Sequence, residues 1–331
     1  SASDSEVKQE APAASEPKAT AAPVAAAIPE GSDKHAEVVV LGSGPGGYTA
    51  AFRAADLGKS VILIEKFSNI GGVCLNVGCI PSKALLHTAQ IINEAEDISA
   101  HGVVFGKPKI DIKKIVEYKN NIINQLTGGL AGLAKQRKVE IVTGYGKFTS
   151  PKTIDVEGED GTTTISFDDV IIAAGSSVMK IPGFPYDDER LMDSTGALEL
   201  KEVPKRLMVI GGGIIGLEMA TVYDALGSKV SIVELSPGLI PGCDRDLVRP
   251  LERRVKKRYE NIWLNAKVTD IKALKSGLKV SFEGKNVPET DTFDRVLLAV
   301  GRTPNGKLID AAKAGVQVDE RGFIAADKQQ K

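Results

Sequence analysis

Short apolar runs alternate with glycine-rich turns and longer helical patterns over most of the chain. Residues 37–41 (Glu-Val-Val-Val-Leu) are a β-branched run typical of a buried strand. A glycine-rich turn occupies 42–47, an alanine-rich helical pattern occupies 48–57, and Gly58 is well placed to end that helix. The run 60–65 indicates a further strand, so these segments predict one complete βαβ unit.

The same order recurs later in the chain without gaps. The second copy has a strand, a glycine turn, a helix and a strand at 207–210, 211–216, 217–226 and 229–234. Each copy is followed well downstream by an apolar run that enters a glycine turn, at 170–175 and at 296–301. The predicted fold class is therefore α/β, with two tandem Rossmann-like dinucleotide-binding domains.

The segments around these units are helical or linker-like. Residues 81–100 and 115–133 show helical patterns that we assign to core packing, and 140–170 predicts short antiparallel strands. Residues 1–33 are rich in Ala, Pro, Ser, Glu and Lys and have almost no large apolar side chains, which predicts a disordered or semi-stiff linker. Composition leaves open whether this linker is a simple tail or a tether to another domain.

Composition excludes several classes of partner. The chain has 331 residues, enough for two domains plus additional segments, and its 42 Lys and Arg balance 43 Asp and Glu. This balance gives no electrostatic reason to expect nucleic acid or an anionic membrane. No uncharged apolar run is long enough to span a membrane, and no signal peptide is visible, although the chain starts with Ser rather than Met. With only three cysteines, a reducing compartment and hence the cytoplasm is expected, and no metal site is predicted.

The first glycine turn has the pattern G-x-G-x-x-G at Gly42, Gly44 and Gly47. The first glycine permits the tight turn, the second lets the backbone approach a pyrophosphate, and the third lets helix and strand pack closely. Glu65, at the end of the following strand, can accept hydrogen bonds from ribose hydroxyls. A plain glycine turn is the alternative, but the full order of elements occurs twice, which favours nucleotide binding.

The second glycine turn matches the first at Gly211, Gly213 and Gly216, with Glu234 in the place of the first acid. A carboxylate at this position hydrogen-bonds a 2′-hydroxyl and repels a 2′-phosphate. No arginine follows Glu234 directly, so the second site is predicted to prefer NAD to NADP.

Two cysteines, Cys74 and Cys79, lie in the glycine-containing run 71–83 just before a predicted helix. A disulfide that closes so short a loop removes little chain entropy, which argues against a purely stabilising crosslink. Free buried cysteines are the other alternative, but they would not require this glycine-flanked spacing. Because a helix N-terminus lowers a thiolate pKa, we interpret the pair as redox-active.

The motif Gly-Gly-x-Cys-x-x-x-x-Cys-x-Pro-Ser-Lys resembles the active-site motif of the pyridine nucleotide–disulfide oxidoreductases. Within this family, 71–86 is similar to the members that reoxidise dihydrolipoyl groups in 2-oxoacid dehydrogenase complexes. The resemblance extends from about residue 36 to the end, and 1–33 is similar to the linkers that follow lipoyl domains. It implies FAD and NAD as cofactors, lipoyl groups of an acyltransferase subunit as partner, and a homodimer.

The resemblance also implies roles for individual residues. Cys74 would exchange disulfides with the lipoyl group, and Cys79 would lie over the flavin and pass electrons to it. Lys83 would lie near the reactive nitrogen of the flavin and pair with Glu218, although Glu218 is equally explained as a first-turn acid that favours the helix dipole. Cys243 matches nothing in the family, so we interpret it as an ordinary thiol.

Further cofactor contacts follow from the same resemblance. The FAD-adenine contact would be Gly146, for which a plain turn glycine is a strong alternative. The other expected contacts outside the residues already named are Gly46, Lys66, Gly72, Val73, Ala174, Gly175, Ile214, Val268, Ala299, Gly301 and Arg302.

The resemblance predicts a domain order of linker 1–33, FAD-binding domain 34–181, inserted NAD-binding domain 182–304, and return segment 305–331. The family continues into a flavin-contacting Asp motif and an interface domain that carries a His–Glu base and forms the dimer, and neither is found here. We therefore expect a fragment or a truncated relative, and negligible physiological activity from 1–331 alone, because a general base is needed to form the attacking thiolate.

Two other functions remain open from the sequence. A glutathione- or mercuric-type reductase would prefer NADPH and would be expected to carry a basic residue near Glu234. A non-catalytic flavin-binding module could instead act as a scaffold within a larger complex.

Overall fold

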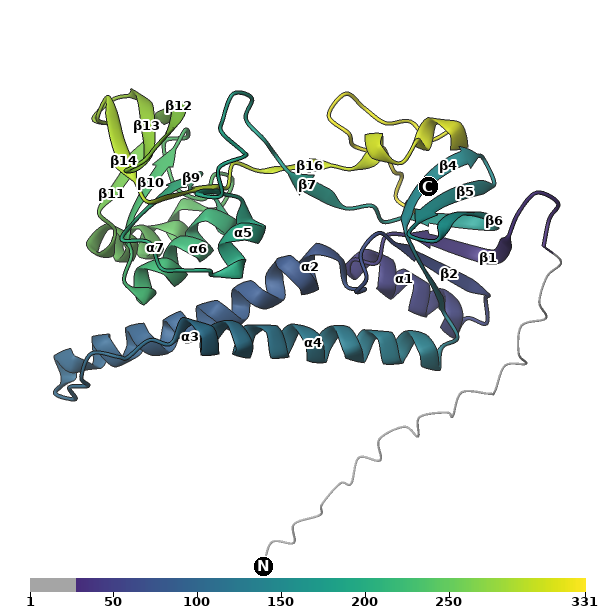
Figure 1. Ribbon diagram of the computed structural model, residues 1–331, viewed down its shortest axis with the longest axis horizontal. Coiled ribbons are helices and arrows are strands. Elements are labelled where there is room, and N and C mark those ends of the chain that lie inside the picture. Colours follow the sequence, from purple (N-terminus) through teal and green to yellow (C-terminus); the bar gives the residue numbers. More distant parts are fainter. Residues whose placement is uncertain (1–27) are drawn as a thin grey trace, which may run out of the picture.

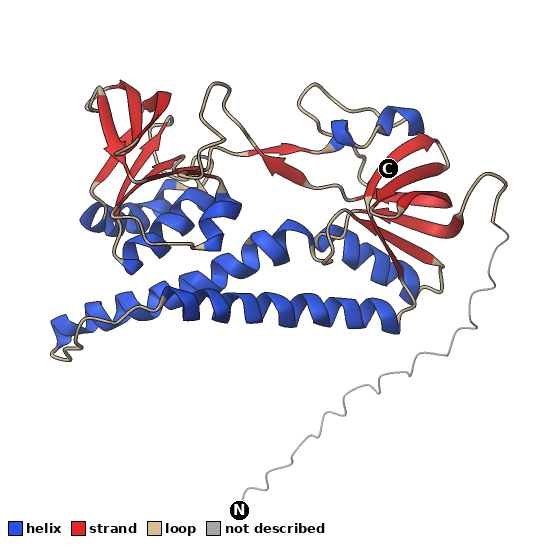
Figure 2. Cartoon of the chain, viewed as in Figure 1, coloured by secondary structure: helices blue, strands red, loops and turns tan. Residues whose placement is uncertain are grey.

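The computed structural model describes residues 28–331 and has an α/β fold (Figures 1 and 2). Residues 1–27, most of the predicted linker, lie outside the described residues. Two α/β units are joined by a narrow two-stranded ribbon, and a long helical hairpin runs along both of them (Figure 1). The mixed parallel and antiparallel sheets confirm the predicted fold class at this level.

The first unit is built on a six-stranded sheet of order β3-β2-β1-β6-β5-β4. Its elements are β1 (Lys34–Leu41), α1 (Pro45–Asp56), β2 (Val61–Glu65), β3 (Glu140–Thr143), β4 (Tyr145–Ser150), β5 (Thr153–Gly158) and β6 (Gly161–Ile172). The strand β1 pairs in parallel with both β2 and β6, and its valines are buried on both faces of the sheet. Because side chains alternate along a strand, Val39 faces one apolar cluster while Val38 and Val40 face the other.

The prediction of antiparallel strands over 140–170 is only partly correct. The strands β4, β5 and β6 form an antiparallel meander, but β3 pairs in parallel with β2 (Ile62 opposite Glu140). The physical reason is the long helix that precedes β3, because a helical crossover returns the chain in the direction of the neighbouring strand. The twelve-residue β6 pairs antiparallel with β5 and parallel with β1, so it joins the two kinds of pairing.

The second unit repeats the βαβ arrangement on a five-stranded sheet of order β11-β10-β9-β15-β8. Its elements are β8 (Leu191–Met192), α5 (Ser194–Glu199), β9 (Arg206–Ile210), α6 (Ile214–Leu226), β10 (Lys229–Glu234), α7 (Arg245–Arg258), β11 (Asn261–Leu264) and β15 (Arg295–Leu298). A separate antiparallel sheet, inserted before β15, contains β12 (Ala266–Leu274), β13 (Gly277–Gly284) and β14 (Thr290–Phe293). The predicted second strand 229–234 has the same bounds as β10.

The helical hairpin connects the two units. It consists of α2 (Gly72–Val77), α3 (Cys79–Asp97), the 3-10 turn η1 (Ile98–His101) and α4 (Ile112–Gln136), which confirms the two predicted helical segments. The prediction that the apolar residues of 115–133 pack in a core is only partly correct, because Tyr118, Leu126 and Leu133 are exposed on α4. The α3 residue Leu85 belongs to the apolar core of the second unit, whereas Leu130 and Ala134 of α4 pack in the core of the first. The hairpin therefore packs into the cores of both units and links them.

A return segment brings the chain back to the first unit. The strand β16 (Arg302–Pro304) pairs antiparallel with β7 (Ser176–Val178), and two 3-10 turns, η2 (Gly306–Leu308) and η3 (Ala311–Ala314), follow. The Phe148 N–H donates to the carbonyl of Ile309 (3.0 Å), and Ile309 is buried against the first sheet. No helix within residues 28–331 has the length and apolar character needed to cross a membrane.

Candidate active site

A cavity of about 540 Å³ opens where the first unit, α2, α3, α6 and the return segment meet. It begins at the carboxyl ends of β1 and β2 and extends to the start of α6, so both units contribute to its wall. In open α/β sheets, ligands bind outside the carboxyl ends of the strands, where the chain connections leave a crevice. The position of the cavity is therefore typical of a nucleotide-binding site.

Of the three motif glycines in the first turn, only one has free space where a Cβ would be. Gly42 has φ +104°, and a Cβ there would lie 2.4 Å from the carbonyl oxygen of Ala173. A Cβ on Gly47 would lie 1.8 Å from the carbonyl oxygen of Gly42, so α1 could not approach β1 with any larger residue. Gly44 lines the cavity, and a Cβ there would meet no protein atom within 4 Å. The open side of the turn thus faces the cavity.

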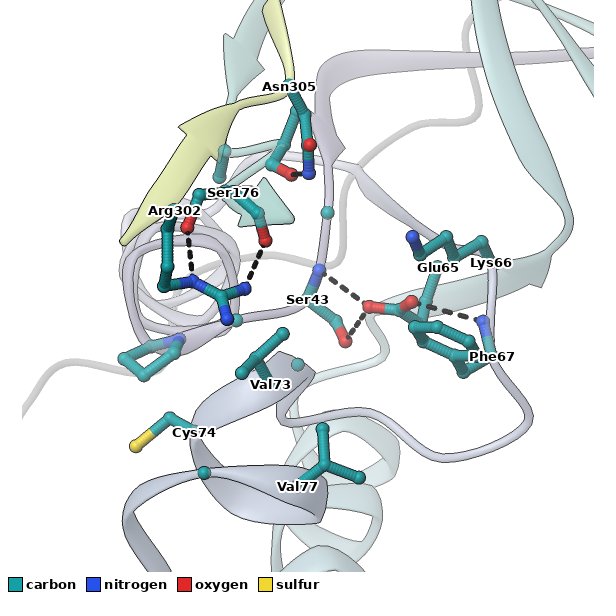
Figure 3. Close-up of a pocket in the computed structure, with 18 of the residues that line it drawn as sticks. Ser43, Glu65, Lys66, Phe67, Val73, Cys74, Val77, Ser176, Arg302 and Asn305 are labelled. Atoms are coloured by element: carbon teal, nitrogen blue, oxygen red, sulfur yellow. Dashed lines mark hydrogen bonds between the residues drawn. The ribbon is translucent and has the colours of Figure 1, made fainter. Parts of the chain in front are cut away.

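Glu65 holds this turn in place. Its Oε2 accepts from the Ser43 N–H (3.1 Å) and the Ser43 hydroxyl (2.5 Å), and its Oε1 accepts from the Phe67 N–H (3.1 Å) (Figure 3). The residue is only 5% exposed, yet it lines the cavity. Sequence reasoning anticipated a ribose contact here but missed this structural role, because Ser43 is an unspecified position of the glycine motif.

The second glycine turn has the same geometry. A Cβ on Gly211 (φ +109°) would lie 2.4 Å from the Ala299 carbonyl oxygen, and one on Gly216 would lie 2.2 Å from the Gly211 carbonyl oxygen. Gly213 again has no protein atom within 4 Å of an added Cβ. Two turns with the same pattern of filled and open positions indicate two sites for the same kind of ligand group.

Glu234 repeats the contacts of Glu65. Its Oε2 accepts from the Gly212 N–H (2.6 Å), and its Oε1 accepts from the Ser236 N–H (2.7 Å). Glu234 is half-buried at the end of β10 and does not line the large cavity.

Fifteen of the residues singled out from the sequence line the cavity: Gly42, Gly44, Glu65, Lys66, Gly72, Val73, Cys74, Cys79, Lys83, Gly146, Ala174, Gly175, Ile214, Glu218 and Arg302. Gly46 and Gly47 belong to α1 and do not line it. The others lie in the second unit: Gly211, Gly213, Gly216, Glu234, Val268, Ala299 and Gly301. Among these, Val268 is buried in the apolar core of the second unit.

Gly146 lies within β4 rather than in a turn, so the plain-turn alternative is wrong. A Cβ at this position would lie 2.6 Å from Cδ1 of Leu41. The absence of a side chain at Gly146 therefore lets β4 lie close to the Leu41 side chain at the end of β1, whatever else the glycine contacts in the cavity.

The two cysteines lie on consecutive helices, Cys74 in α2 and Cys79 at the first residue of α3. Both are free thiols, Cys74 half-buried and Cys79 exposed in the cavity wall. The predicted Cys74–Cys79 disulfide stays a prediction. Figure 3 shows Cys74 on the α2 helix below Val73.

The expectation that a helix N-terminus lowers the pKa of this pair is wrong for Cys74. Burial and then the hydrogen bond and charge of Cys79 raise the pKa of Cys74 to about 11. The backbone of Cys79 and the ammonium of Lys83 act in the opposite direction but are weaker. The physical reason is that Cys74, although in the first turn of the short helix α2, is partly buried, and burial disfavours the charged thiolate.

Lys83 and Glu218 meet across the contact between α3 and α6. Lys83 Nζ lies 2.6 Å from Glu218 Oε1, and the hydrogen bond with Glu218 raises the pKa of Lys83. The hydroxyl of Ser82 donates to Glu218 Oε2 (2.6 Å). The structure thus brings together the predicted Lys83–Glu218 pair and adds Ser82, which sequence reasoning did not select.

The return segment also supplies contacts that sequence reasoning missed. Arg302 donates from Nε to the Ser176 hydroxyl (2.8 Å) and from its guanidinium to the Ser176 carbonyl (Figure 3). The Asn305 amide donates to the Ala174 carbonyl (2.8 Å) and accepts from the Ser177 hydroxyl (2.8 Å). Arg302 was expected as a cofactor contact, but its bonds to Ser176 and the bonds of Asn305 were not, because pairing between segments this distant leaves no local signal.

A comparison with protein-family models shows which family the chain belongs to. The family model described as "Pyridine nucleotide-disulphide oxidoreductase" matches residues 36–331.

The chain belongs to the pyridine nucleotide-disulphide oxidoreductase family.

Several curated relatives are named dihydrolipoyl dehydrogenase. The protein from Vibrio cholerae is 58% identical over 295 residues, which are 89% of this chain and 62% of that protein. The protein from Haemophilus influenzae is 53% identical over 88% of this chain and 61% of its own length. The mitochondrial dihydrolipoyl dehydrogenase 1 of Arabidopsis thaliana is 42% identical over 89% of this chain and 59% of its own length. The chain thus spans about 60% of the length of these relatives.

Solved structures show the same relationship. The Cu(II) complex of the HOCl-induced flavoprotein disulfide reductase RclA from Escherichia coli superposes with a TM-score of 0.78 at 29% identity. The match covers 89% of this chain and 63% of that protein.

Proposed function

We propose that this chain is the nucleotide-binding part of a dihydrolipoyl dehydrogenase, which oxidises dihydrolipoyl groups through Cys74 and Cys79 and uses FAD and NAD. One observation carries the proposal: both cysteines lie in the wall of a cavity that also contains the open glycine turn and the Lys83–Glu218 pair. The names of relatives with 42–58% identity support the choice of substrate.

The residues of the cavity fit a bound FAD. The free space beside Gly44 would admit a pyrophosphate, and the N-terminus of α1 directs backbone N–H groups toward it. Glu65 keeps unused acceptor capacity for ribose hydroxyls, and Lys66 lies beside it. When bound, FAD supplies the chemistry that accepts two electrons from a dithiol and delivers them as hydride to NAD.

The second glycine turn fits NAD for the same reason, because Gly213 leaves space at the N-terminus of α6. Glu234 would accept a ribose hydroxyl and repel a 2′-phosphate. We accordingly assign 34–181 and 305–331 to an FAD domain and 182–304 to an inserted NAD domain, both of Rossmann type. The parallel pairings of β1 with β2 and of β9 with β10 support this division.

The cysteine pair would exchange disulfides with the substrate. A thiolate of the dihydrolipoyl group attacks Sγ of Cys74, the Cys74–Cys79 bond breaks, and Cys79 leaves as a thiolate. The second substrate sulfur then displaces Cys74, which forms the lipoyl disulfide. The two cysteines retain the two electrons, and the two substrate thiols release their protons.

Lys83 supports the reduced state of the pair. Its ammonium is close enough to Cys74 to lower the pKa of that thiol, although burial outweighs the effect. Glu218 accepts from Lys83 Nζ at Oε1 and keeps this charge at the junction of α3 and α6.

The proposal extends to the surroundings of the protein. The substrate group would be carried by an acyltransferase subunit of a 2-oxoacid dehydrogenase complex, and the active form would be a homodimer. The small number of cysteines favours a reducing compartment, so we place the protein in the cytoplasm.

Steady-state assays of the full-length holoenzyme test the function. We expect reduction of NAD by dihydrolipoamide, with NADP a poor acceptor. A preference for NADP(H) with glutathione disulfide or Hg(II) would instead support a reductase of another substrate class. Co-elution with the acyltransferase core but no turnover with any dithiol would support the non-catalytic module.

A further inference from the structure

One carboxylate joins the cysteine helix to the second unit. Glu218 lies on α6, and its two oxygens accept from consecutive residues of α3. Oε2 accepts from the Ser82 hydroxyl and Oε1 from Lys83 Nζ, each at 2.6 Å. Each oxygen therefore has its own donor on the same turn of α3.

These two bonds differ in their surroundings. The Lys83 side chain is 62% exposed and that of Glu218 is 23% exposed, so their ion pair is open to water and salt on one side. Exposed ion pairs of this kind hold long side chains only weakly. Ser82 is 3% exposed, and a buried hydroxyl that donates to a carboxylate makes a stronger and more directional bond than an exposed ion pair does. Ser82 is thus the firmer of the two anchors.

The position of Lys83 matters to the sulfurs. Cys79, Ser82 and Lys83 stand at i, i+3 and i+4 of α3, so they share one helix face, and all three line the cavity. The charged or titratable groups that act on Cys74 are Cys79 and Lys83. A mobile ammonium would spend less time near the sulfurs and stabilise a thiolate less.

We propose that Ser82 is a positioning residue, which holds the Glu218 carboxylate so that Glu218 keeps the Lys83 ammonium beside the cysteine pair. Without the hydroxyl, the Glu218 carboxylate loses its buried donor and turns toward water, and Lys83 follows it. This inference rests on the proposed function only in taking the cysteine pair as the reactive group.

The test is thiol alkylation in the reduced holoenzyme, which requires neither substrate nor turnover. Iodoacetamide labelling of Cys74 is followed by peptide mass spectrometry as a function of pH for the wild type and for Ser82→Ala. We expect the rate for S82A below the thiol pKa to fall about threefold, since the thiolate fraction falls with a raised pKa. Ser82→Thr, which keeps the hydroxyl, should restore the wild-type profile.

A matched control separates positioning from stability. Ser228, just beyond α6, is also buried, and its hydroxyl donates to the Pro204 carbonyl (2.6 Å) away from the cavity. Ser228→Ala should lower the thermal midpoint as S82A does but leave the Cys74 profile unchanged. A wild-type Cys74 profile in S82A, with only the stability loss of S228A, would overturn the proposal.

A double-mutant cycle tests whether Ser82 acts through Glu218. In a Glu218→Gln background, S82A should change the Cys74 profile no further. A full additional effect in that background would contradict the inference. If dihydrolipoamide proves not to be a substrate, the proposed function fails while these alkylation results still decide the role of Ser82.

Discussion

Two glycines of the first turn should respond differently to replacement by alanine, Gly47 by losing stability and Gly44 by losing flavin affinity. In Gly47→Ala, the new Cβ would lie 1.8 Å from the carbonyl oxygen of Gly42, a backbone atom that cannot move without shifting β1 or α1. Overpacking of this kind costs about 1–3 kcal/mol, and a backbone clash places the loss at the upper end. We therefore expect G47A to lose about 3 kcal/mol of unfolding free energy.

Gly44→Ala should behave differently. The backbone at Gly44 is extended (φ −65°, ψ −179°), and the added methyl meets no protein atom within 4 Å. Reduced freedom of the unfolded chain would stabilise the variant by about 0.4–1 kcal/mol, and the poorer helix N-cap would offset this by a similar amount. The unfolding free energy should therefore stay within about 1 kcal/mol of the wild type. The methyl occupies the space assigned to the pyrophosphate, so the FAD affinity should fall at least about tenfold.

Urea denaturation and flavin titration of the flavin-depleted proteins measure both quantities. The expected result is a stable G44A with little bound flavin and a destabilised G47A. A G44A variant that binds FAD as tightly as the wild type would refute the assignment of the cavity. A G47A variant of wild-type stability would refute the packing argument.

Three further predictions concern other parts of the structure. In steady-state assays, kcat/KM for reduction of the enzyme by NADH should exceed that for NADPH at least about tenfold. Glu234→Ala should narrow this ratio, and it should also destabilise the second glycine turn, because the Gly212 and Ser236 N–H groups lose their acceptor. The rate of Cys74 alkylation should rise with pH up to about 11, the raised pKa of this thiol. Cys79→Ala should shift this profile to lower pH, but not as far as the ordinary thiol pKa of 9.0, because burial is the largest cause of the raised pKa. An unshifted profile would contradict the contact between the two thiols. Lys119 is 6% exposed and donates to the Leu198 carbonyl (2.7 Å), so Lys119→Met should lose about 1–3 kcal/mol in chemical denaturation. Burial lowers the pKa of Lys119, so the folded state binds fewer protons, wild-type stability should rise with pH toward 10.5, and K119M should lack this rise.

The sequence predicts best those features that depend on neighbouring residues. The strand, turn, helix and strand around Gly42 and around Gly211 appear within a few residues of their expected bounds, because apolar runs and glycines act locally. The two helices of the hairpin are also as expected, since their apolar spacing is regular.

Features that depend on distant pairing were not predictable in the same way. The parallel direction of β3 depends on the crossover through α4, and the sheet β12–β14 packs on the second unit without a strong local pattern. The contact between Ser82 and Glu218 joins two elements far apart in the chain, and the raised pKa of Cys74 depends on burial. The family resemblance supplied the Lys83–Glu218 pair but said nothing of the serine beside it.

The central claim is that the cysteine pair meets a flavin in the cavity next to Lys83. Anaerobic titration of the holoenzyme with dihydrolipoamide tests this claim most directly, because a thiolate in contact with a flavin gives a long-wavelength absorption band. We predict that this band appears in the wild type before the flavin is fully bleached and is absent from Cys79→Ser. A wild type that bleaches without the band, or a C79S variant that retains it, would contradict the account.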